Sequence, residues 1–357
     1  MSSNKRGSIL VFILALIVLL SVLCMRLMQE TVQELRHVSQ FHRRDDLRMH
    51  AYSALDVAVG ALNEFMMLEK TLYSPSQGWG DPLGYAEITP LDSRVQWSIS
   101  LIDESGKVPI SAISEKDLVS LFAIMRAEED SLVNEDDGQL FYDTLMDWQD
   151  ADEEERDEGA EDDFYEDLEF PYFTPGKKIE NFEEFRMIKG FAYDVDEPED
   201  SGLFYSENGS ETIHMKNFRD SFSFFNNGPV NINTASSYLV KFLCGDDDGL
   251  YDEILTGPSG SSGDPFFKSM NDPKLAQMRK NRSISTSTMS TVFRALITVN
   301  KGKANFQLHA ILASGKGIQS SPKGGKGKLQ KPRSQQNLKI RYPFRVLSIR
   351  ENENLVD

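Results

Sequence analysis

The residues best suited to chemistry form an acidic run in the middle of the chain. Thirteen Asp and Glu residues and one basic residue, Arg156, lie between residues 150 and 169. Without a cation, so many like charges repel one another within a Debye length of about 8 Å. Carboxylate oxygens are the ligands that Ca²⁺ prefers, about six to eight at a time. The run is therefore either a solvated acidic loop, the usual fate of such a stretch, or a calcium site, and both interpretations stand.

The spacing of these acids is not that of an EF-hand. Asp150 and Asp152 alternate with other residues, and Glu161 is the twelfth position counted from Asp150, as an EF-hand requires. Glu155, however, occupies the sixth position, where an EF-hand needs glycine for its sharp turn. A calcium site in this run would thus be of another type.

The other reactive residues do not combine into an active site. Five histidines are scattered along the sequence, which carries no phosphate-binding glycine loop, zinc-ligand spacing or nucleophile turn. The two cysteines, Cys24 and Cys244, are too far apart in the sequence to suggest a disulfide framework. A formal net charge of −18 disfavours a nucleic-acid partner, which would need a basic face. We expect a non-enzymatic protein, with an acidic hydrolase as the remaining enzymatic alternative.

The N-terminal stretch is apolar enough to attach the protein, and with it the acidic run, to a membrane. Lys5, Arg6 and Gly7 precede 18 uncharged residues, 8–25. As a helix these span roughly 27 Å, close to a bilayer's hydrocarbon core. A secretory signal peptide is disfavoured because the apolar run is long and no small-residue cleavage site follows it. A lipoprotein would use Cys24, but a bulky residue precedes it. A single-pass anchor fits, with Lys5 and Arg6 holding the N-terminus in the cytoplasm.

The same residues resemble a class III leader, as carried by type IV pilins and type II secretion pseudopilins. This resemblance implies that a prepilin peptidase cuts after Gly7 and that the amine of Ser8 is then methylated. Most such proteins carry glutamate at the fifth mature position, which here is Phe12. A carboxylate in a membrane helix costs a few kcal/mol unless it finds a partner. Within this family, the member that lacks the glutamate is the K subunit of type II secretion.

Periodicity predicts one continuous helix over residues 8–68, half in the membrane and half amphipathic, with two separate helices as the alternative. An apolar stripe recurs along its second half at three- and four-residue spacing: Leu47, Ala51, Ala54, Ala58, Leu62 and Phe65. Strands are expected at 84–88, 95–103, 291–300, 304–313 and 340–350, and helices at 115–127, 138–150, 180–190 and 238–244. Residues 314–337 are low in complexity and mostly basic, and we interpret them as a disordered excursion from the sheet.

Two short motifs flank the expected helical region. Residues 103–107 carry an acidic pair followed by Gly-Lys, and residues 230–235 read Val-Asn-Ile-Asn-Thr-Ala. Asn233 or Thr234 is a good N-cap for the helix that follows. The second motif also occurs in helix-hairpin-helix proteins, so an exported, membrane-anchored DNA-binding protein is an alternative. Three aspartates at 246–248 count against it, because such modules hold phosphate with Lys or Arg.

The acidic run resembles that of protein K in type II secretion systems. That family carries Asp-Trp-x-Asp-x-Asp, then Gly-Ala-Glu and a tyrosine. This chain has the same residues in order: Asp147, Trp148, Asp150, Asp152, Gly159, Ala160, Glu161 and Tyr165. The motif at 103–107 matches the family in part, and the motif at 230–235 matches it well. Because the family binds calcium in this region, the resemblance implies a Ca²⁺ cofactor held by Asp147, Asp150, Asp152, Glu161 and Asp162.

The resemblance also implies an α+β fold. A pilin-like long N-terminal helix would pack on a small antiparallel sheet, with a large inserted α-helical domain. The expected divisions are a leader peptide at 1–7, a transmembrane and filament-core helix at 8–28, the pilin-like helix and first strands at 29–109, the inserted helical domain with the acidic loop at 110–285, and C-terminal strands at 286–357 with a disordered loop at 314–337.

The function implied is that of a minor pseudopilin that caps and initiates the pseudopilus of a bacterial type II secretion system. Expected partners are the I, J and H types of minor pseudopilin, the major pseudopilin, prepilin peptidase and the inner-membrane secretion platform, with no nucleic acid. Residues expected to pack with partner helices are Phe12, Leu16, Leu47, Ala51 and Leu62. The expected location is the bacterial inner membrane, single-pass, with a cytoplasmic N-terminus and periplasmic C-terminal domains. A minor pilin of a type IV pilus is the alternative within the same superfamily.

Overall fold

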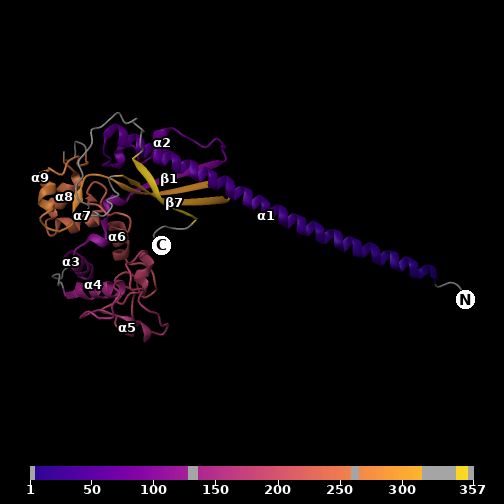
Figure 1. Cartoon of the computed structure of the whole chain (residues 1–357), viewed down its shortest axis with the longest axis horizontal. Coiled ribbons are helices and arrows are strands. Elements are labelled where there is room, and N and C mark those ends of the chain that lie inside the picture. The colour runs from indigo at the N-terminus through magenta and orange to yellow at the C-terminus, as the bar shows by residue number, and fades with distance from the viewer. Residues whose placement is uncertain (1–4, 128–135, 259–264, 316–342, 353–357) are drawn as a thin grey trace, which may run out of the picture.

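One long helix runs through the protein. The computed structural model describes residues 5–127, 136–258, 265–315 and 343–352. Helix α1 (Lys5–Glu69) has 65 residues, which at 1.5 Å per residue makes it roughly 97 Å long. Its N-terminal half projects away from the rest of the molecule (Figure 1). The span Phe12–Thr31 has a mean hydropathy of 2.3 and is nowhere buried, so it is long and apolar enough to cross a membrane. The prediction of one continuous helix is confirmed.

A four-stranded antiparallel sheet packs against the C-terminal half of α1. Its spatial order is β1-β6-β7-β8, and its strands are β1 (Val95–Asp103), β6 (Val292–Lys301), β7 (Ala304–Ser314) and β8 (Phe344–Glu351). The predicted apolar stripe of α1 forms a core with one face of this sheet, in contact with residues such as Ile297 and Leu308. The burial of alternate residues on β6 follows from the period of two in its sequence.

The residues expected to contact partner helices divide into two groups in this structure. Leu47, Ala51 and Leu62 are buried against the chain's own sheet, so they are not free to contact another subunit in this arrangement. Phe12 and Leu16 lie on the projecting part of α1 and are 70% and 47% exposed. Only these two therefore remain candidates for packing with a partner helix.

The chain between β1 and β6 forms a large, mostly helical part with its own core. Its α-helices are α3 (Glu115–Arg126), α4 (Asp136–Gln149), α5 (Asp162–Glu166), α6 (Ile213–Ser221), α7 (Ser237–Cys244), α8 (Asp248–Thr256) and α9 (Pro273–Met278). Its 3₁₀ helices are η2 (Glu104–Gly106), η3 (Ile110–Ala112) and η4 (Phe182–Met187). Two-residue strands pair in parallel as β2 (Val108–Pro109) with β3 (Phe222–Ser223) and β4 (Val230–Asn231) with β5 (Thr286–Ser287).

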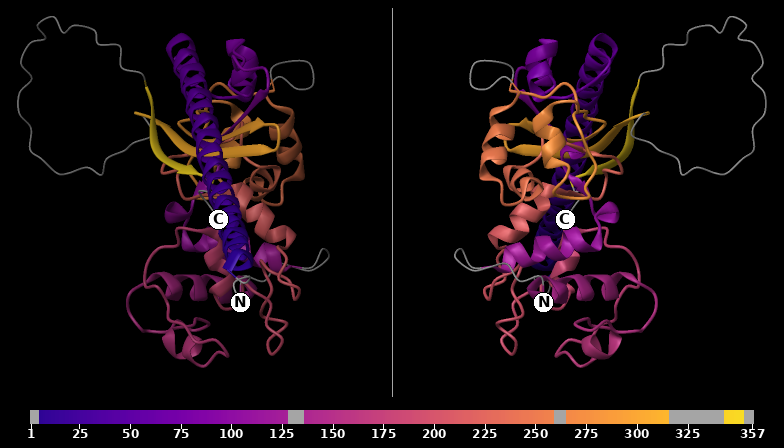
Figure 2. Two further views of the ribbon diagram at one scale, coloured as in Figure 1. Left: turned by 90° about the vertical axis from the view of Figure 1, so that its right-hand side faces the viewer. Right: turned by 90° about the vertical axis from the view of Figure 1, so that its left-hand side faces the viewer.

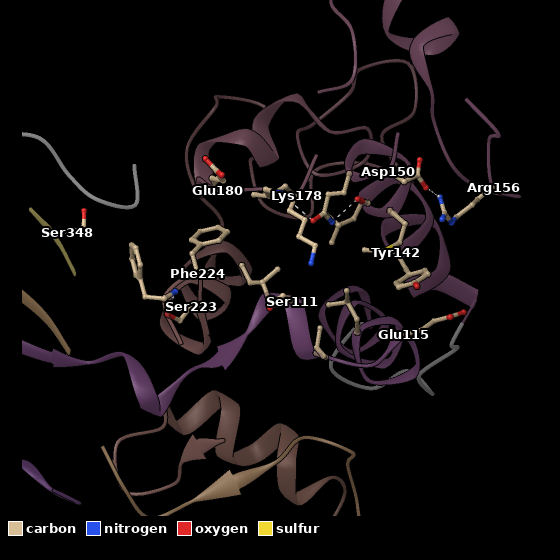
Figure 3. A pocket seen from close by; sticks show the side chains of 18 of the residues that line it. Ser111, Glu115, Tyr142, Asp150, Arg156, Lys178, Glu180, Ser223, Phe224 and Ser348 are labelled. Carbon is tan, nitrogen blue, oxygen red and sulfur yellow. Dashed lines mark hydrogen bonds and ion pairs between the residues drawn. The ribbon is translucent and has the colours of Figure 1, made fainter. Parts of the chain in front are cut away.

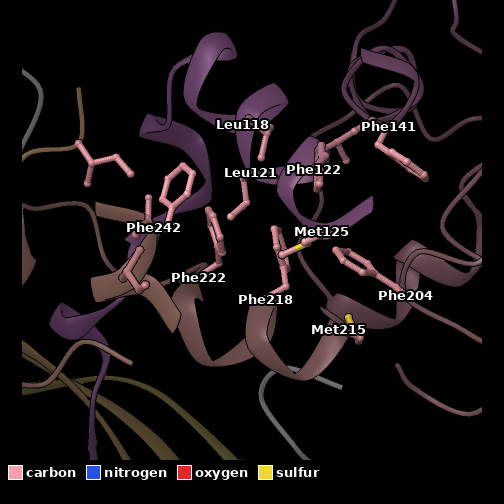
Figure 4. Close-up of a cluster of buried hydrophobic side chains, with 14 of the residues drawn as sticks. Leu118, Leu121, Phe122, Met125, Phe141, Phe204, Met215, Phe218, Phe222 and Phe242 are labelled. Carbon is pink, nitrogen blue, oxygen red and sulfur yellow. The ribbon is translucent and has the colours of Figure 1, made fainter. Parts of the chain in front are cut away.

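Aromatic side chains fill this second core. Phe122, Phe204 and Phe218 are at most 1% exposed and meet ring to ring (Figure 4). Phe218 also stacks on Phe222, with ring centroids 4.2 Å apart. Aromatic pairs at such distances add about 0.5–1.5 kcal/mol each beyond the area they bury. The inserted part thus has a hydrophobic core separate from that under the sheet, as the predicted α+β fold requires.

Some predicted secondary-structure elements and one predicted helix cap differ from the structure. Residues 84–88 do not form a strand: helix α2 (Pro82–Ala86) is capped by the Asp81 side chain, which accepts a hydrogen bond from the Gly84 amide, and follows η1 (Pro75–Gln77). The predicted α-helix at 180–190 is the shorter 3₁₀ helix η4. Helix α7 is capped by Ser236 rather than by Asn233 or Thr234. The predicted disordered loop at 314–337 lies outside the described residues, except for 314–315.

The two motifs that flank the inserted part meet at one buried carboxylate. Asp103, at the end of β1, is 6% exposed. Its Oδ2 accepts hydrogen bonds from Thr234 Oγ1 and Ser290 Oγ, both at 2.6 Å, and from Asn231 Nδ2 at 3.0 Å. Its Oδ1 accepts from the Ser105 amide at 2.9 Å. Burial raises the pKa of Asp103, while these four donors oppose the shift. The carboxylate therefore ties the strand that leaves the sheet to the segment that returns to it.

Glu104 adds a buried ion network beside this joint. Its Oε1 lies 2.9 Å from Arg294 Nε on β6 and 3.6 Å from Lys107 Nζ, and its Oε2 accepts from Ser223 Oγ at 2.5 Å. The Glu104 side chain is 2% exposed. Because its charge is paired and hydrogen-bonded, the burial that would otherwise be costly is tolerated here. The sheet and the inserted part are joined through side chains as well as through the backbone.

Candidate metal centre

The acidic loop folds back so that three of its carboxylates converge. Asp150 directly follows helix α4, Asp152 lies in the loop, and Glu161 precedes helix α5. One oxygen from each of the three lies within 4.8 Å of the others, a separation that a single cation can bridge. These residues are three of the five predicted ligands.

Glu161 is the most unusual of the three. It is 6% exposed, and neither of its carboxylate oxygens has a hydrogen-bond partner among the described residues. Within the described ranges, Asp150 Oδ1 is also buried without a donor. Burial, followed by repulsion from Asp147 and Asp150, raises the pKa of Glu161 to about 7. Buried carboxylates ordinarily have donors, and oxygen atoms left without them in a converging group fit a hard cation such as Ca²⁺.

Asp147 is placed as a support for the loop. Its side chain is fully buried on α4, and both of its carboxylate oxygens have partners within the protein. Oδ2 accepts from the Ala160 amide at 3.0 Å and from the Arg156 amide at 3.2 Å, and Oδ1 contacts Arg156 Nη1. A Cβ at Gly159 would lie 1.8 Å from Asp147 Oδ2, which is why the loop needs glycine there. In this motif Gly159 allows the loop to approach the Asp147 carboxylate closely, and the amide of Ala160 donates a hydrogen bond to it.

The carboxylate of Asp162 also accepts hydrogen bonds from other protein groups. Its Oδ1 accepts hydrogen bonds from the Thr174 amide at 2.8 Å and from Thr174 Oγ1 at 2.9 Å. These bonds fix the start of α5 to the segment that follows it. The structure does not bring Asp147 or Asp162 into the converging group.

The aromatic residues of the motif support the loop from beneath. Trp148 and Tyr165 are at most 2% exposed and meet edge to face, with ring centroids 5.4 Å apart. The ring centroids of Tyr172 and Tyr165 are 5.2 Å apart. Lys189, far along the chain, donates its amide to the Tyr165 hydroxyl at 3.3 Å and its Nζ to the Gly159 carbonyl at 3.4 Å. The sequence offered no signal for Lys189, whereas Arg156 was recognisable as the only basic residue of the run.

A cavity of about 630 Å³ lies beside the centre, between helices α3 and α4 of the inserted part and strand β8. Figure 3 shows Asp150, Arg156 and Tyr142 at one side of this cavity, Lys178 nearer its middle, and Ser348 of β8 across from them. The ion pair of Asp150 and Arg156 forms part of its wall, so the acidic loop is reachable from this side.

Comparisons with known proteins agree with the motif. Residues 111–195, which hold α3, α4 and the acidic loop, match the family described as "Type II secretion system (T2SS), protein K". A search of curated proteins finds no match. One chain from the crystal structure of the GspK–GspI–GspJ complex of the enterotoxigenic Escherichia coli type 2 secretion system is similar in fold, with a TM-score of 0.54 and 15% identity. That similarity covers 89% of this chain and all of the other. The predicted resemblance to type II secretion system protein K is thereby confirmed over residues 111–195, and the similar structure agrees with the predicted fold.

Proposed function

We propose that this protein is a minor pseudopilin that caps and initiates the pseudopilus of a bacterial type II secretion system. The observation that carries the proposal is the place of the inserted part. Figure 1 shows helices α3–α5 and α7–α9 gathered at the end of the molecule opposite the projecting half of α1. Viewed along α1, this part spreads well to the side of the helix (Figure 2). A subunit added above would meet this bulk, so the protein suits the tip.

The projecting half of α1 supplies the attachment to other subunits. In the proposed sequence of events, prepilin peptidase cuts between Gly7 and Ser8 and the new amine is methylated. The apolar helix then leaves the bilayer and packs with the helices of neighbouring subunits, with Phe12 and Leu16 at the contact. A tip subunit has no neighbour above it to pair with a carboxylate at the fifth mature position, which is consistent with Phe12 there.

Partners follow from the similar complex. That structure is described as containing GspK, GspI and GspJ, and we propose minor pseudopilins of the I and J types as direct partners here. The H-type subunit, the major pseudopilin and the inner-membrane platform complete the expected assembly. The N-terminus would be cytoplasmic and the C-terminal parts periplasmic. The described residues do not support the DNA-binding alternative, because Asn231 of its motif is fully buried and donates a hydrogen bond to Asp103.

We also propose that Asp150, Asp152 and Glu161 hold Ca²⁺. The ion would neutralise three converging carboxylates and fix the acidic loop, which is a structural use of the metal. Calorimetric titration of the full chain in detergent should show Ca²⁺ binding that Glu161→Gln abolishes. A chain without measurable Ca²⁺ binding would contradict the metal centre and leave the pseudopilin role untouched.

Co-purification tests the assembly. The full chain should be isolated from membranes together with the other minor pseudopilins of its own secretion system, and N-terminal sequencing should begin at Ser8. A mature chain that starts at Met1, or beyond Met25, would contradict the leader. In a pilus-overproduction assay, a variant in which a short linker replaces residues 111–285 should lose control of filament number and length. Filaments indistinguishable from those of the intact system would contradict capping by the inserted part.

A further inference from the structure

The only basic residue of the acidic run lies inside the candidate centre. Arg156 Nη1 contacts Asp147 Oδ1 and donates to Asp150 Oδ2 at 2.7 Å. Asp147 is fully buried, whereas the Arg156 side chain is 37% exposed. Burial lowers the pKa of Arg156, but the hydrogen bonds to Asp150 and Asp147 outweigh it and raise the pKa above its usual value. The guanidinium is therefore a permanent positive charge in the loop.

Asp150 faces two kinds of partner at once. Its Oδ2 accepts a hydrogen bond from Arg156, while its Oδ1 is buried with no donor among the residues that the structure describes. The same carboxylate belongs to the converging group with Asp152 and Glu161. A cation held by that group would share Asp150 with the guanidinium, and Asp150 could not give it both oxygens while the bond to Arg156 persists.

We propose that Arg156 is the built-in counter-cation of this centre. In the absence of metal it holds Asp147 and Asp150 in place against the repulsion of the surrounding acids. When a divalent cation binds, the charge of Arg156 opposes it and limits the affinity. This inference rests on the proposed calcium site.

The sign of the effect separates this role from simple support. If Arg156 only shaped the loop, its removal would weaken Ca²⁺ binding, because the ligands would lose their arrangement. If it is a counter-cation, its removal tightens binding, because a positive charge that shares a carboxylate with the ion is gone. Two cations a few ångströms apart repel strongly enough, even at the dielectric constant of water, for a change of about tenfold in affinity.

The experiment compares the full chain in detergent with Arg156→Gln and Arg156→Lys. The lysine variant is the matched control, because it keeps the charge and loses only the guanidinium geometry. Calorimetry measures Ca²⁺ affinity, and thermal unfolding with a chelator present measures the metal-free protein. We expect Arg156→Gln to bind Ca²⁺ about tenfold more tightly and to melt at a lower temperature without metal. Arg156→Lys should keep an affinity within about threefold of the original, since the Coulomb term is preserved.

Each outcome decides between the alternatives. Binding by Arg156→Gln that equals or falls below that of the unaltered chain overturns the counter-cation role and leaves the calcium site standing. If Arg156→Gln binds Ca²⁺ and the unaltered chain does not, the counter-cation role is supported, because the arginine then keeps the ion out of the unaltered chain. No binding by either protein overturns the calcium site and this inference with it. If Arg156→Gln is unfolded without metal, recovery of its fold on adding Ca²⁺ supports the role, and failure to recover in millimolar Ca²⁺ overturns it.

Discussion

At the scale of single residues, the acidic loop shows that identical side chains acquire different roles from their surroundings. Asp147 and Asp162 accept hydrogen bonds and support the loop, whereas Glu161 is buried and neither of its oxygens has a donor in the described part of the chain. The cost of keeping Glu161 in this position depends on its protonation, and that dependence can be measured.

Glu161→Gln should stabilise the metal-free protein at both pH 5.5 and pH 8, and more strongly at pH 8. The pKa of Glu161 is about 7 in the fold, against a reference value of 4.5. Between these values the folded state keeps a proton that the unfolded state has lost, so stability falls as the pH rises. Gln mimics the protonated acid, and its advantage should grow by about 2 kcal/mol between the two pH values. Chemical denaturation with a chelator measures this.

The control for that series is Glu166→Gln, at an exposed position on α5. It should show no such dependence on pH. A Glu161→Gln advantage of the same size at pH 5.5 and pH 8 would mean that Glu161 titrates normally in the fold.

Gly159→Ala should destabilise the protein by about 1–3 kcal/mol, the usual cost of overpacking a tight contact. The added Cβ would lie 1.8 Å from Asp147 Oδ2, so either the loop or α4 must move. Gly60→Ala on α1 is the control, because nothing lies within 4 Å of its Cβ position. Thermal unfolding that ranks the two variants as equal would contradict the close approach at Gly159.

At the scale of elements, the sheet and the inserted part depend on each other through Asp103. Replacing Asp103 by Ala removes the acceptor of Thr234 Oγ1, Ser290 Oγ and the Ser105 amide. We expect a loss of at least about 3 kcal/mol, because each unsatisfied buried donor costs about 1–3 kcal/mol. Hydrogen exchange should quicken both at Asn231 and at the start of β6.

Asp56→Ala, at an exposed position on α1, is the control for this joint. It should leave the denaturation midpoint nearly unchanged. Equal midpoints for Asp103→Ala and Asp56→Ala would show that the two parts are held together by their backbone connections and not by this carboxylate.

At the scale of the whole molecule, the apolar span of α1 that could cross a membrane is separate from the part of α1 that packs on the sheet. The span Phe12–Thr31 is nowhere buried, whereas the core on α1 begins at Leu47. A chain lacking residues 1–31 should therefore stay in solution after high-speed centrifugation and keep its melting temperature within about 2 °C, since the span Phe12–Thr31 contributes nothing to the core. A truncated chain that still sediments with membranes, or that melts much lower, would contradict this division.

The sequence by itself determined most of the elements and the resemblance of the acidic motif. The long apolar run predicted the projecting helix, the stripe from Leu47 to Phe65 predicted its buried face, and alternation predicted β1, β6 and β7. These signals are local, because the periods of helices and strands are written in neighbouring residues. The spacing of the acidic motif was specific enough to indicate a resemblance to type II secretion protein K, which the match at residues 111–195 confirmed for that part of the chain.

Only the tertiary structure decided which residues meet. Asp103 and Asn231 are 128 residues apart, and nothing in either motif indicated that one side chain would accept a hydrogen bond from the other. The five predicted ligands had the same chemistry in the sequence. The fold separated them, because burial and hydrogen-bond donors reach a carboxylate through space, from Thr174 or from the amides around Gly159, and not through its neighbours in the chain.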